Sequence, residues 1–255
     1  MRSAVLMCHA PIVIPDIAGP RAVDCATTTA AMQRTARAVV ATRPSVLVVL
    51  SPHTPRDRTR WGLVTGDRLA GSFARFGHPG VALSLPNAHE AVREALGDVP
   101  LADLSPYPLD HGALVPLWFL VQAGWHGPTA VLGVPWSNTH GLDLGRALSA
   151  RADWAVVASG DMSHRLLPGA PAGFDPEASR FDEGFVQSLR AGRLEDAVRP
   201  DADLRERAAE DVVDTTEVLL GALGPVLDFD PVLAYEGPFG VGYCEAVLHP
   251  RPEPR

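Results

Sequence analysis

The chain has 255 residues, of which 46% are hydrophobic, and it carries a formal net charge of −8 at pH 7. This length and hydrophobic content suffice for one large α/β domain, and the acidity argues against nucleic acid or an anionic membrane surface as a partner. All 22 basic residues are arginines, which excludes a P-loop lysine and a Schiff-base lysine.

The cysteines and the apolar runs indicate the cellular compartment of the protein. Cys8, Cys25 and Cys244 are an odd number of cysteines and form no CxxC pair. This usage is typical of a reducing compartment, so we expect a cytoplasmic protein. The sequence contains no run of eighteen apolar residues, so it predicts no membrane-spanning helix.

Hydrophobic patterning predicts alternating strands and helices along the chain. In chain order we expect a strand at 3–8, a helix at 23–42, a strand at 45–50, edge strands within 56–86, helices at 87–97 and 113–123, a strand at 129–134, a helix at 142–151, a strand at 154–158, helices at 177–190 and 204–223, and strands at 232–236 and 241–248. This order predicts a single α/β domain over residues 1–255, with a central, mostly parallel or mixed sheet flanked by helices on both faces. Residues 250–255 are expected to form a frayed tail.

Three of the predicted strands end in a polar segment that carries a histidine. His9 follows the first strand, His53 follows the strand at 45–50, and His164 follows the strand at 154–158. Carboxyl ends of parallel strands are where open α/β folds keep their chemistry, and neutral imidazole is a common ligand for divalent transition metals. We expect the strands before His9 and His53 to be neighbouring parallel strands, so that both side chains can reach one ion; the alternative is a pair of hydrogen-bonded loop histidines.

Four short motifs occur in a fixed order along the chain: Cys8-His9-Ala10-Pro11, Ser51-Pro52-His53, Asp110-His111-Gly112 and Ser159-Gly160-Asp161-Met162-Ser163-His164. Together they resemble the class III extradiol ring-cleavage dioxygenases, in particular the B-type catalytic chain of these enzymes, and their Memo-like relatives. The resemblance covers the chain from residue 9 to about residue 245. It implies a non-haem Fe(II) enzyme that opens a catechol-like aromatic ring with O₂.

The resemblance also implies a set of metal ligands. The family holds its iron with two histidines and one carboxylate, and the two histidines correspond to His9 and His53. The carboxylate precedes a late helix, where we expect Glu210, with Asp211 and Glu236 as alternatives. Memo-like relatives carry a cysteine at about the position of Asp211. Glu210 could instead be a solvated carboxylate at the start of a helix, stabilised by the helix dipole.

The remaining family histidines correspond to His164 and His111. We expect His164 to act as base and acid, because a catechol must lose a proton as it chelates iron. We expect His111 to orient substrate or O₂ by hydrogen bonding. The implied partners are a small aromatic substrate and O₂, and the resemblance leaves open a homo-oligomer or a separate small subunit. Two other functions fit the same residues: a Memo-like protein that binds metal or a partner without ring cleavage, and a Zn-dependent hydrolase.

Overall fold

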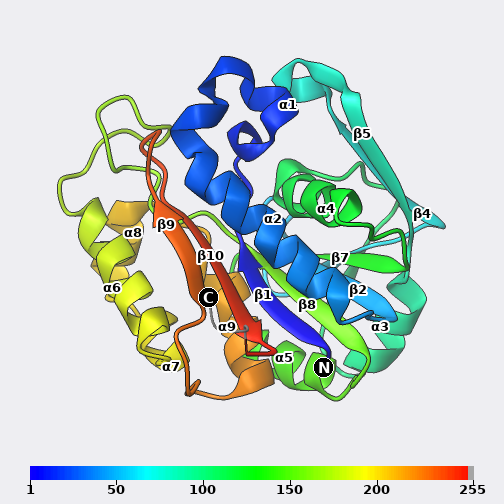
Figure 1. Cartoon of the computed structure of the whole chain (residues 1–255). Coiled ribbons are helices and arrows are strands. Elements are labelled where there is room, and N and C mark those ends of the chain that lie inside the picture. Colours follow the sequence, from blue (N-terminus) through cyan, green and yellow to red (C-terminus); the bar gives the residue numbers. More distant parts are fainter. Residues whose placement is uncertain (252–255) are drawn as a thin grey trace.

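An eight-stranded mixed sheet forms the centre of the structure, a computed structural model that describes residues 1–251 (Figure 1). Its strands lie in the order β6-β3-β7-β2-β8-β1-β10-β9. Their bounds are β1 (Ser3–Met7), β2 (Val46–Ser51), β3 (Trp61–Val64), β6 (Leu101–Leu104), β7 (Thr129–Gly133), β8 (Trp154–Ser159), β9 (Val232–Glu236) and β10 (Tyr243–His249). The predicted frayed tail lies mostly at 252–255, outside the described residues.

The four middle strands β7, β2, β8 and β1 run parallel to one another. Every residue in these strands is buried, since helices cover both faces of the sheet, and this explains their unbroken apolar sequences. On either side the direction changes, because β10 pairs with β1 and β3 pairs with β7 in antiparallel fashion. The sheet is therefore mixed, as predicted.

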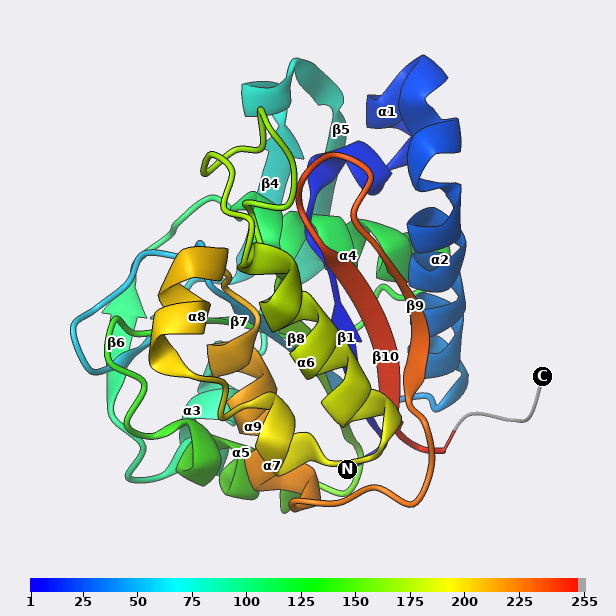
Figure 2. The same ribbon diagram turned by 90° about the vertical axis from the view of Figure 1, so that its left-hand side faces the viewer.

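Helices pack on both faces of the sheet, which confirms the predicted α/β class. The helices α2 (Ala26–Ala41) and α4 (His111–Gln122) lie on one face, and Figure 2 shows α2 on the opposite side of the sheet from α6 (Ala178–Arg190). The other helices are α1 (Pro15–Ala18), α3 (His89–Leu96), α5 (Gly141–Ser149), α7 (Leu194–Ala197), α8 (Ala202–Ala208) and α9 (Val213–Leu223). Two buried hydrophobic clusters, one on each face, form the core.

A separate hairpin stands beside the sheet near the start of α4. It consists of β4 (Arg68–Phe73) and β5 (His78–Pro86), joined by a short 3₁₀ helix, Ala74–Phe76 (Figure 1). This is the hairpin-like excursion predicted within residues 56–86. Among residues 1–251, no helix has both the length and the apolar character needed to cross a membrane.

Two expectations were wrong in ways that affect the site. The strands before His9 and His53 are not neighbours, because β8 lies between β1 and β2 and pairs with both. The helix predicted at 204–223 is two helices, since α8 ends at Ala208 and α9 begins at Val213. Between them Ala209 has a φ of +54°, a left-handed conformation that an α-helix does not contain.

Candidate metal centre

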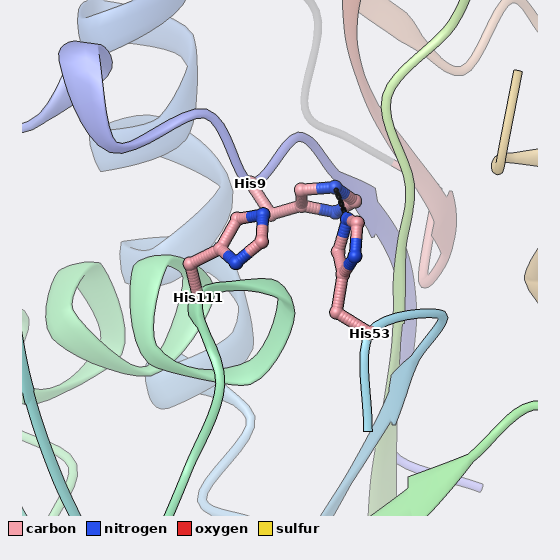
Figure 3. A group of neighbouring side chains, drawn as sticks. All are labelled: His9, His53 and His111. Carbon is pink, nitrogen blue, oxygen red and sulfur yellow. Dashed lines mark hydrogen bonds between the residues drawn. The ribbon is translucent and has the colours of Figure 1, made fainter. Parts of the chain in front are cut away.

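Three histidines meet at the carboxyl edge of the parallel strands (Figure 3). His9 follows β1, His53 follows β2, and His111 is the first residue of α4. One ligand nitrogen from each of the three rings lies within 4.8 Å of the other two, so this group could hold a metal ion. Although β8 separates β1 from β2, the Nε2 atoms of His9 and His53 are only 3.0 Å apart, because both side chains reach across the end of β8.

A carboxylate joins the first two histidines. The Oδ2 atom of Asp211 is 3.2 Å from His53 Nε2 and 3.4 Å from His9 Nε2. Ligands that bind a divalent transition metal at about 2.1 Å and at right angles to one another would be roughly 3.0 Å apart. Two imidazole nitrogens and one carboxylate oxygen at this spacing match the two-histidine, one-carboxylate arrangement in which one side of the ion stays open.

The structure does not bring Glu210 or Glu236 to the histidines. The carboxylate of Glu210 accepts the backbone N–H groups of Val212 and Val213 and pairs with Arg205. Glu236 accepts hydrogen bonds from the backbone N–H and the hydroxyl of Thr28, near the start of α2. Of the three carboxylates considered from the sequence, only Asp211 lies beside His9 and His53.

Hydrogen bonding sets the tautomer of His9. The hydroxyl of Ser159, at the end of β8, donates its only hydrogen to the carbonyl of Gly112 at 2.6 Å. Ser159 Oγ is also 3.0 Å from His9 Nδ1, so it must accept a hydrogen bond from that nitrogen. The proton of the neutral ring is therefore on Nδ1, and the lone pair of Nε2 points toward His53 and Asp211, as metal coordination requires.

Asp110 fastens the loop that carries His53. This residue caps the start of α4 and accepts the hydroxyl of Ser51 at 2.7 Å and that of Thr54 at 2.6 Å. The next residue but one, Gly112, lies so close that a Cβ atom there would be 2.4 Å from Ser51 Oγ. The motif Asp110-His111-Gly112 therefore positions His53 as well as placing His111.

The charge around the site favours a cation. Burial lowers the pKa of His9, but the carboxylates of Asp161 and Asp211 outweigh it and raise the pKa to about 9. Burial raises the pKa of Asp211, but attraction to His9 and hydrogen bonding with His53 hold it well below its usual range. Two imidazole nitrogens and a carboxylate oxygen this close to one another require a proton or a metal ion among them. The donor set therefore fits a divalent transition metal.

His111 and His164 border this group. Burial lowers the pKa of His111 to about 3, with repulsion from His53 and His9 adding to the effect, so its ring is neutral near pH 7. Its ring centroid is 4.1 Å from that of His53. His164 is close enough to contribute to the low pKa of Asp211. In the described part of the chain, the buried Nδ1 atom of His164 has no hydrogen-bond partner.

Some residues of the site were given no role from the sequence. Ser159 orients His9, Asp110 holds the His53 loop, and Asp161 accepts the backbone N–H of His9 at 2.8 Å. An N-cap preference signals the position of Asp110 before an apolar helix. Ser159 and Asp161 flank a glycine directly after a buried strand, but nothing in that pattern states which strand end they face.

Comparisons with known proteins identify the family of the chain. A family model described as the catalytic LigB subunit of aromatic ring-opening dioxygenase matches residues 3–245. Protein CA_C1420 of Clostridium acetobutylicum is 27% identical over 260 residues, and the match covers 93% of this chain and 55% of that protein. The chain thus spans about half the length of this relative.

A solved structure shares the fold. The crystal structure of the uncharacterized protein JW3007 from Escherichia coli K12 superposes with a TM-score of 0.59 and 19% sequence identity. The match covers 96% of this chain and 98% of the other. Because the LigB model matches nearly the whole chain, the protein belongs to the family of the catalytic LigB subunit of aromatic ring-opening dioxygenases, in the class III extradiol dioxygenase superfamily.

Proposed function

We propose that the protein is a non-haem Fe(II) dioxygenase that cleaves a catechol-like aromatic ring with O₂. The observation that carries this proposal is the convergence of His9 Nε2, His53 Nε2 and Asp211 Oδ2 within 3.0 to 3.4 Å of one another. Membership of the LigB family supports the same reaction class. An oxygen donor at position 211, where Memo-like relatives carry a cysteine, favours ring cleavage over metal binding alone.

The two histidines and Asp211, in place of the expected Glu210, would hold the metal. Bound there, Fe(II) would supply the redox chemistry that lets a catechol react with O₂. Asp211 offers one oxygen to it, because Oδ1 already accepts the backbone N–H of Asp161 at 2.8 Å. His9 is 1% exposed, so this side of the centre excludes water, whereas the His53 side chain is 34% exposed and lies on the open side.

His164 is the proposed base and acid. A catechol must lose a proton as it chelates iron, and the imidazole of His164, near Asp211, can take that proton and return it to the opened product. His111 has a different role, because its low pKa keeps it neutral. A neutral imidazole can donate one hydrogen bond and accept another, which suits it to orient substrate or O₂.

The cavities beside the centre support an aromatic substrate. One cavity, of about 700 Å³, reaches Asp211 and is lined largely by charged side chains. The other, of about 600 Å³, reaches His111 and is lined by Phe76, Tyr107, Leu109 and Leu114. An apolar cavity with a few polar groups at one end is the form expected for a small aromatic ligand. The ring of Phe76 already lies 5.5 Å from that of His111, centroid to centroid.

Turnover after anaerobic reconstitution tests this function. Protein loaded with Fe(II) is mixed with O₂ and a panel of catechols, and O₂ uptake is recorded together with the visible absorbance of ring-opened products. We expect stoichiometric iron, one O₂ consumed per ring opened, and no activity in His53→Ala. Stoichiometric iron without turnover of any catechol would contradict the proposal, and ester hydrolysis by the zinc-loaded protein would favour the hydrolase instead.

A further inference from the structure

The carboxylate of Glu210 is buried at the site and fully engaged. Its side chain is 1% exposed. One oxygen accepts the backbone N–H groups of Val212 and Val213, at 2.6 and 2.8 Å. The other oxygen pairs with the guanidinium of Arg205. A buried carboxylate with three donors is held rigidly, since losing any of them would leave charge without compensation.

Arg205 extends this arrangement across the break between two helices. It lies in α8, and its second guanidinium nitrogen is 3.0 Å from Asp214 Oδ1 in the first turn of α9. Glu210 binds the same helix start through the N–H groups of Val212 and Val213. The end of α8 and the beginning of α9 are thus tied by one arginine and two carboxylates. We call Glu210 and Arg205, with the N–H groups of Val212 and Val213, the Glu210 clamp.

The clamp encloses Asp211. Residues 209–212 form a tight turn, and its first residue, Ala209, has a left-handed φ of +54°. In this turn the carboxylates of Glu210 and Asp211 meet different partners, the first at the clamp and the second at His9 and His53. On the inner side, Asp161 donates its backbone N–H to Asp211 Oδ1, and its carbonyl accepts the Asp211 N–H at 3.2 Å.

The inner side of the turn also packs tightly. Gly160 has no side chain, and a Cβ atom there would come within 2.5 Å of Val212 Cα. The segment after β8 therefore supports the turn from one side while the clamp supports it from the other. The backbone of Asp211 lies between these two supports, so a loss on either side would let its carboxylate move relative to the histidines.

We infer that Glu210 and Arg205 are positioning residues that hold Asp211 in place for the metal. The inference rests on the metal site of the proposed function. It extends that proposal because it gives Glu210 and Asp211, which are adjacent in the sequence, different roles. Asp211 binds the metal, and Glu210 fixes the turn from which Asp211 projects. Residues that orient a ligand in this way contribute roughly 10- to 100-fold to metal affinity.

Metal affinity of the folded protein tests the clamp. Dissociation constants for Zn(II) and Co(II) are measured by chelator competition for Glu210→Ala, Glu210→Gln, Arg205→Gln and the wild type. Glu210→Ala removes every contact of the clamp, so we expect affinity to fall roughly 10- to 100-fold. Glu210→Gln keeps an acceptor for the two N–H groups and loses the charge, so it should recover part of that affinity. The visible spectrum of bound Co(II) should change in Glu210→Ala, which a role in stability alone would not cause.

Two controls separate the clamp from the site itself. Glu94→Gln makes the same charge change at an exposed residue of α3, where the described side chains form no ion pair with Glu94, and it should bind metal as the wild type does. If Glu210→Ala does not fold, Glu210→Gln and Arg205→Gln supply the same comparison. Wild-type affinity and Co(II) spectrum in the clamp variants, with metal lost in Asp211→Asn, would overturn the clamp and leave the metal site standing. Wild-type binding in Asp211→Asn would overturn both.

Discussion

Two kinds of local structure carry the proposed ligands, and they hold the side chains by different means. His9 and His53 each lie two residues after the end of β1 and β2, and every residue of both strands is buried in the sheet. Asp211 lies instead in the turn 209–212 between two helices. Strand ends share the rigidity of the sheet, whereas the turn depends on a few side-chain hydrogen bonds. The site therefore has two halves. His9 and His53 form the histidine half, which the sheet holds rigidly, and Asp211 is the carboxylate half, whose position single substitutions in the turn can change.

Each half still has its own supports. Ser159 selects the tautomer of His9, and Asp110 holds the loop of His53. On the other half, Asp161 and Glu210 hold the turn of Asp211 from opposite sides. Substitutions can therefore be ranked by which half they affect and by whether they remove a ligand or a support.

Removing the carboxylate ligand should have the largest effect. Asp211→Asn is nearly isosteric and keeps the acceptor for the Asp161 N–H, but it removes the negative charge between the two histidines. We expect metal affinity to fall roughly a thousand-fold, the size of losing one partner from a buried charged group. Metal analysis after dialysis and chelator competition would measure it. Glu236→Gln is the control, and a larger loss there than in Asp211→Asn would contradict the ligand assignment.

Removing His164 or His111, which the proposed function does not use as metal ligands, should affect turnover and leave the metal in place. His164→Ala should lower kcat roughly a hundred-fold, because proton transfer by a positioned side chain is worth at least that much. His111→Ala should raise KM as well, since His111 borders the apolar cavity. Metal content and steady-state kinetics on a catechol would be measured together. Loss of metal with His164→Ala would contradict its role as base and acid.

The difference between the two halves also explains what could be predicted from the sequence. The continuous apolar runs of β1, β2, β7 and β8 predict buried parallel strands, and the histidines that follow β1 and β2 lie at the edge where such strands end. The spatial order of strands does not follow from their order in the sequence. For this reason β8 was not expected between β1 and β2. The four-residue strand β6 was too short to give a pattern.

The carboxylate half could be predicted only to within one residue. Glu210 and Asp211 are adjacent acids before the same helix, but their carboxylates contact different partners. The turn that contains them begins at Ala209, whose left-handed conformation is uncommon for a residue other than glycine. The continuous pattern over 204–223 predicts one helix, and it does not reveal that Glu210 is buried and accepts the N–H groups of Val212 and Val213 at the start of a second helix. A turn of this kind is determined by tertiary contacts with Arg205 and Gly160, which are not visible in local sequence.

A smaller effect is expected from the support of His9. Ser159→Ala removes the acceptor for His9 Nδ1–H, so the ring can adopt the tautomer whose Nε2 carries the proton and cannot bind metal. We expect zinc affinity to fall roughly tenfold. Chelator competition at one fixed pH measures this, with Ser188→Ala in α6 as the control. An unchanged affinity would mean that His9 keeps its tautomer without the hydroxyl.

The smallest effect concerns Asp182 in α6, which supports the loop between β8 and His164. Its carboxylate accepts the backbone N–H of Ser163 at 2.9 Å and the hydroxyl of Tyr235 at 2.8 Å. Burial raises the pKa of Asp182 to about 6, from an ordinary value of 3.8. The native state therefore binds this proton more tightly than the unfolded state does. The stability that comes from protonating Asp182 is fully present below about pH 4, is lost as the pH rises through 6, and stays lost above that.

Asp182→Asn should remove this pH dependence, because an amide does not ionise. The raised pKa means that ionised Asp182 lowers the free energy of unfolding by on the order of 3 kcal/mol above pH 6. Asp182→Asn removes this cost, but the hydrogen bonds from Ser163 and Tyr235 to the amide are weaker, so the net gain in stability is smaller. We expect the variant to be about 1 kcal/mol more stable than the wild type at pH 8 and no more stable at pH 4. Denaturant unfolding at pH 4, 6 and 8 measures the difference, with Asp98→Asn at an exposed aspartate as the matched control. A variant that is less stable than the wild type at pH 8 would show that the hydrogen bonds to the charged carboxylate outweigh the cost of burying it. In that case Asp182 would resemble Asp110, because both would hold a strand-end loop through a charged carboxylate.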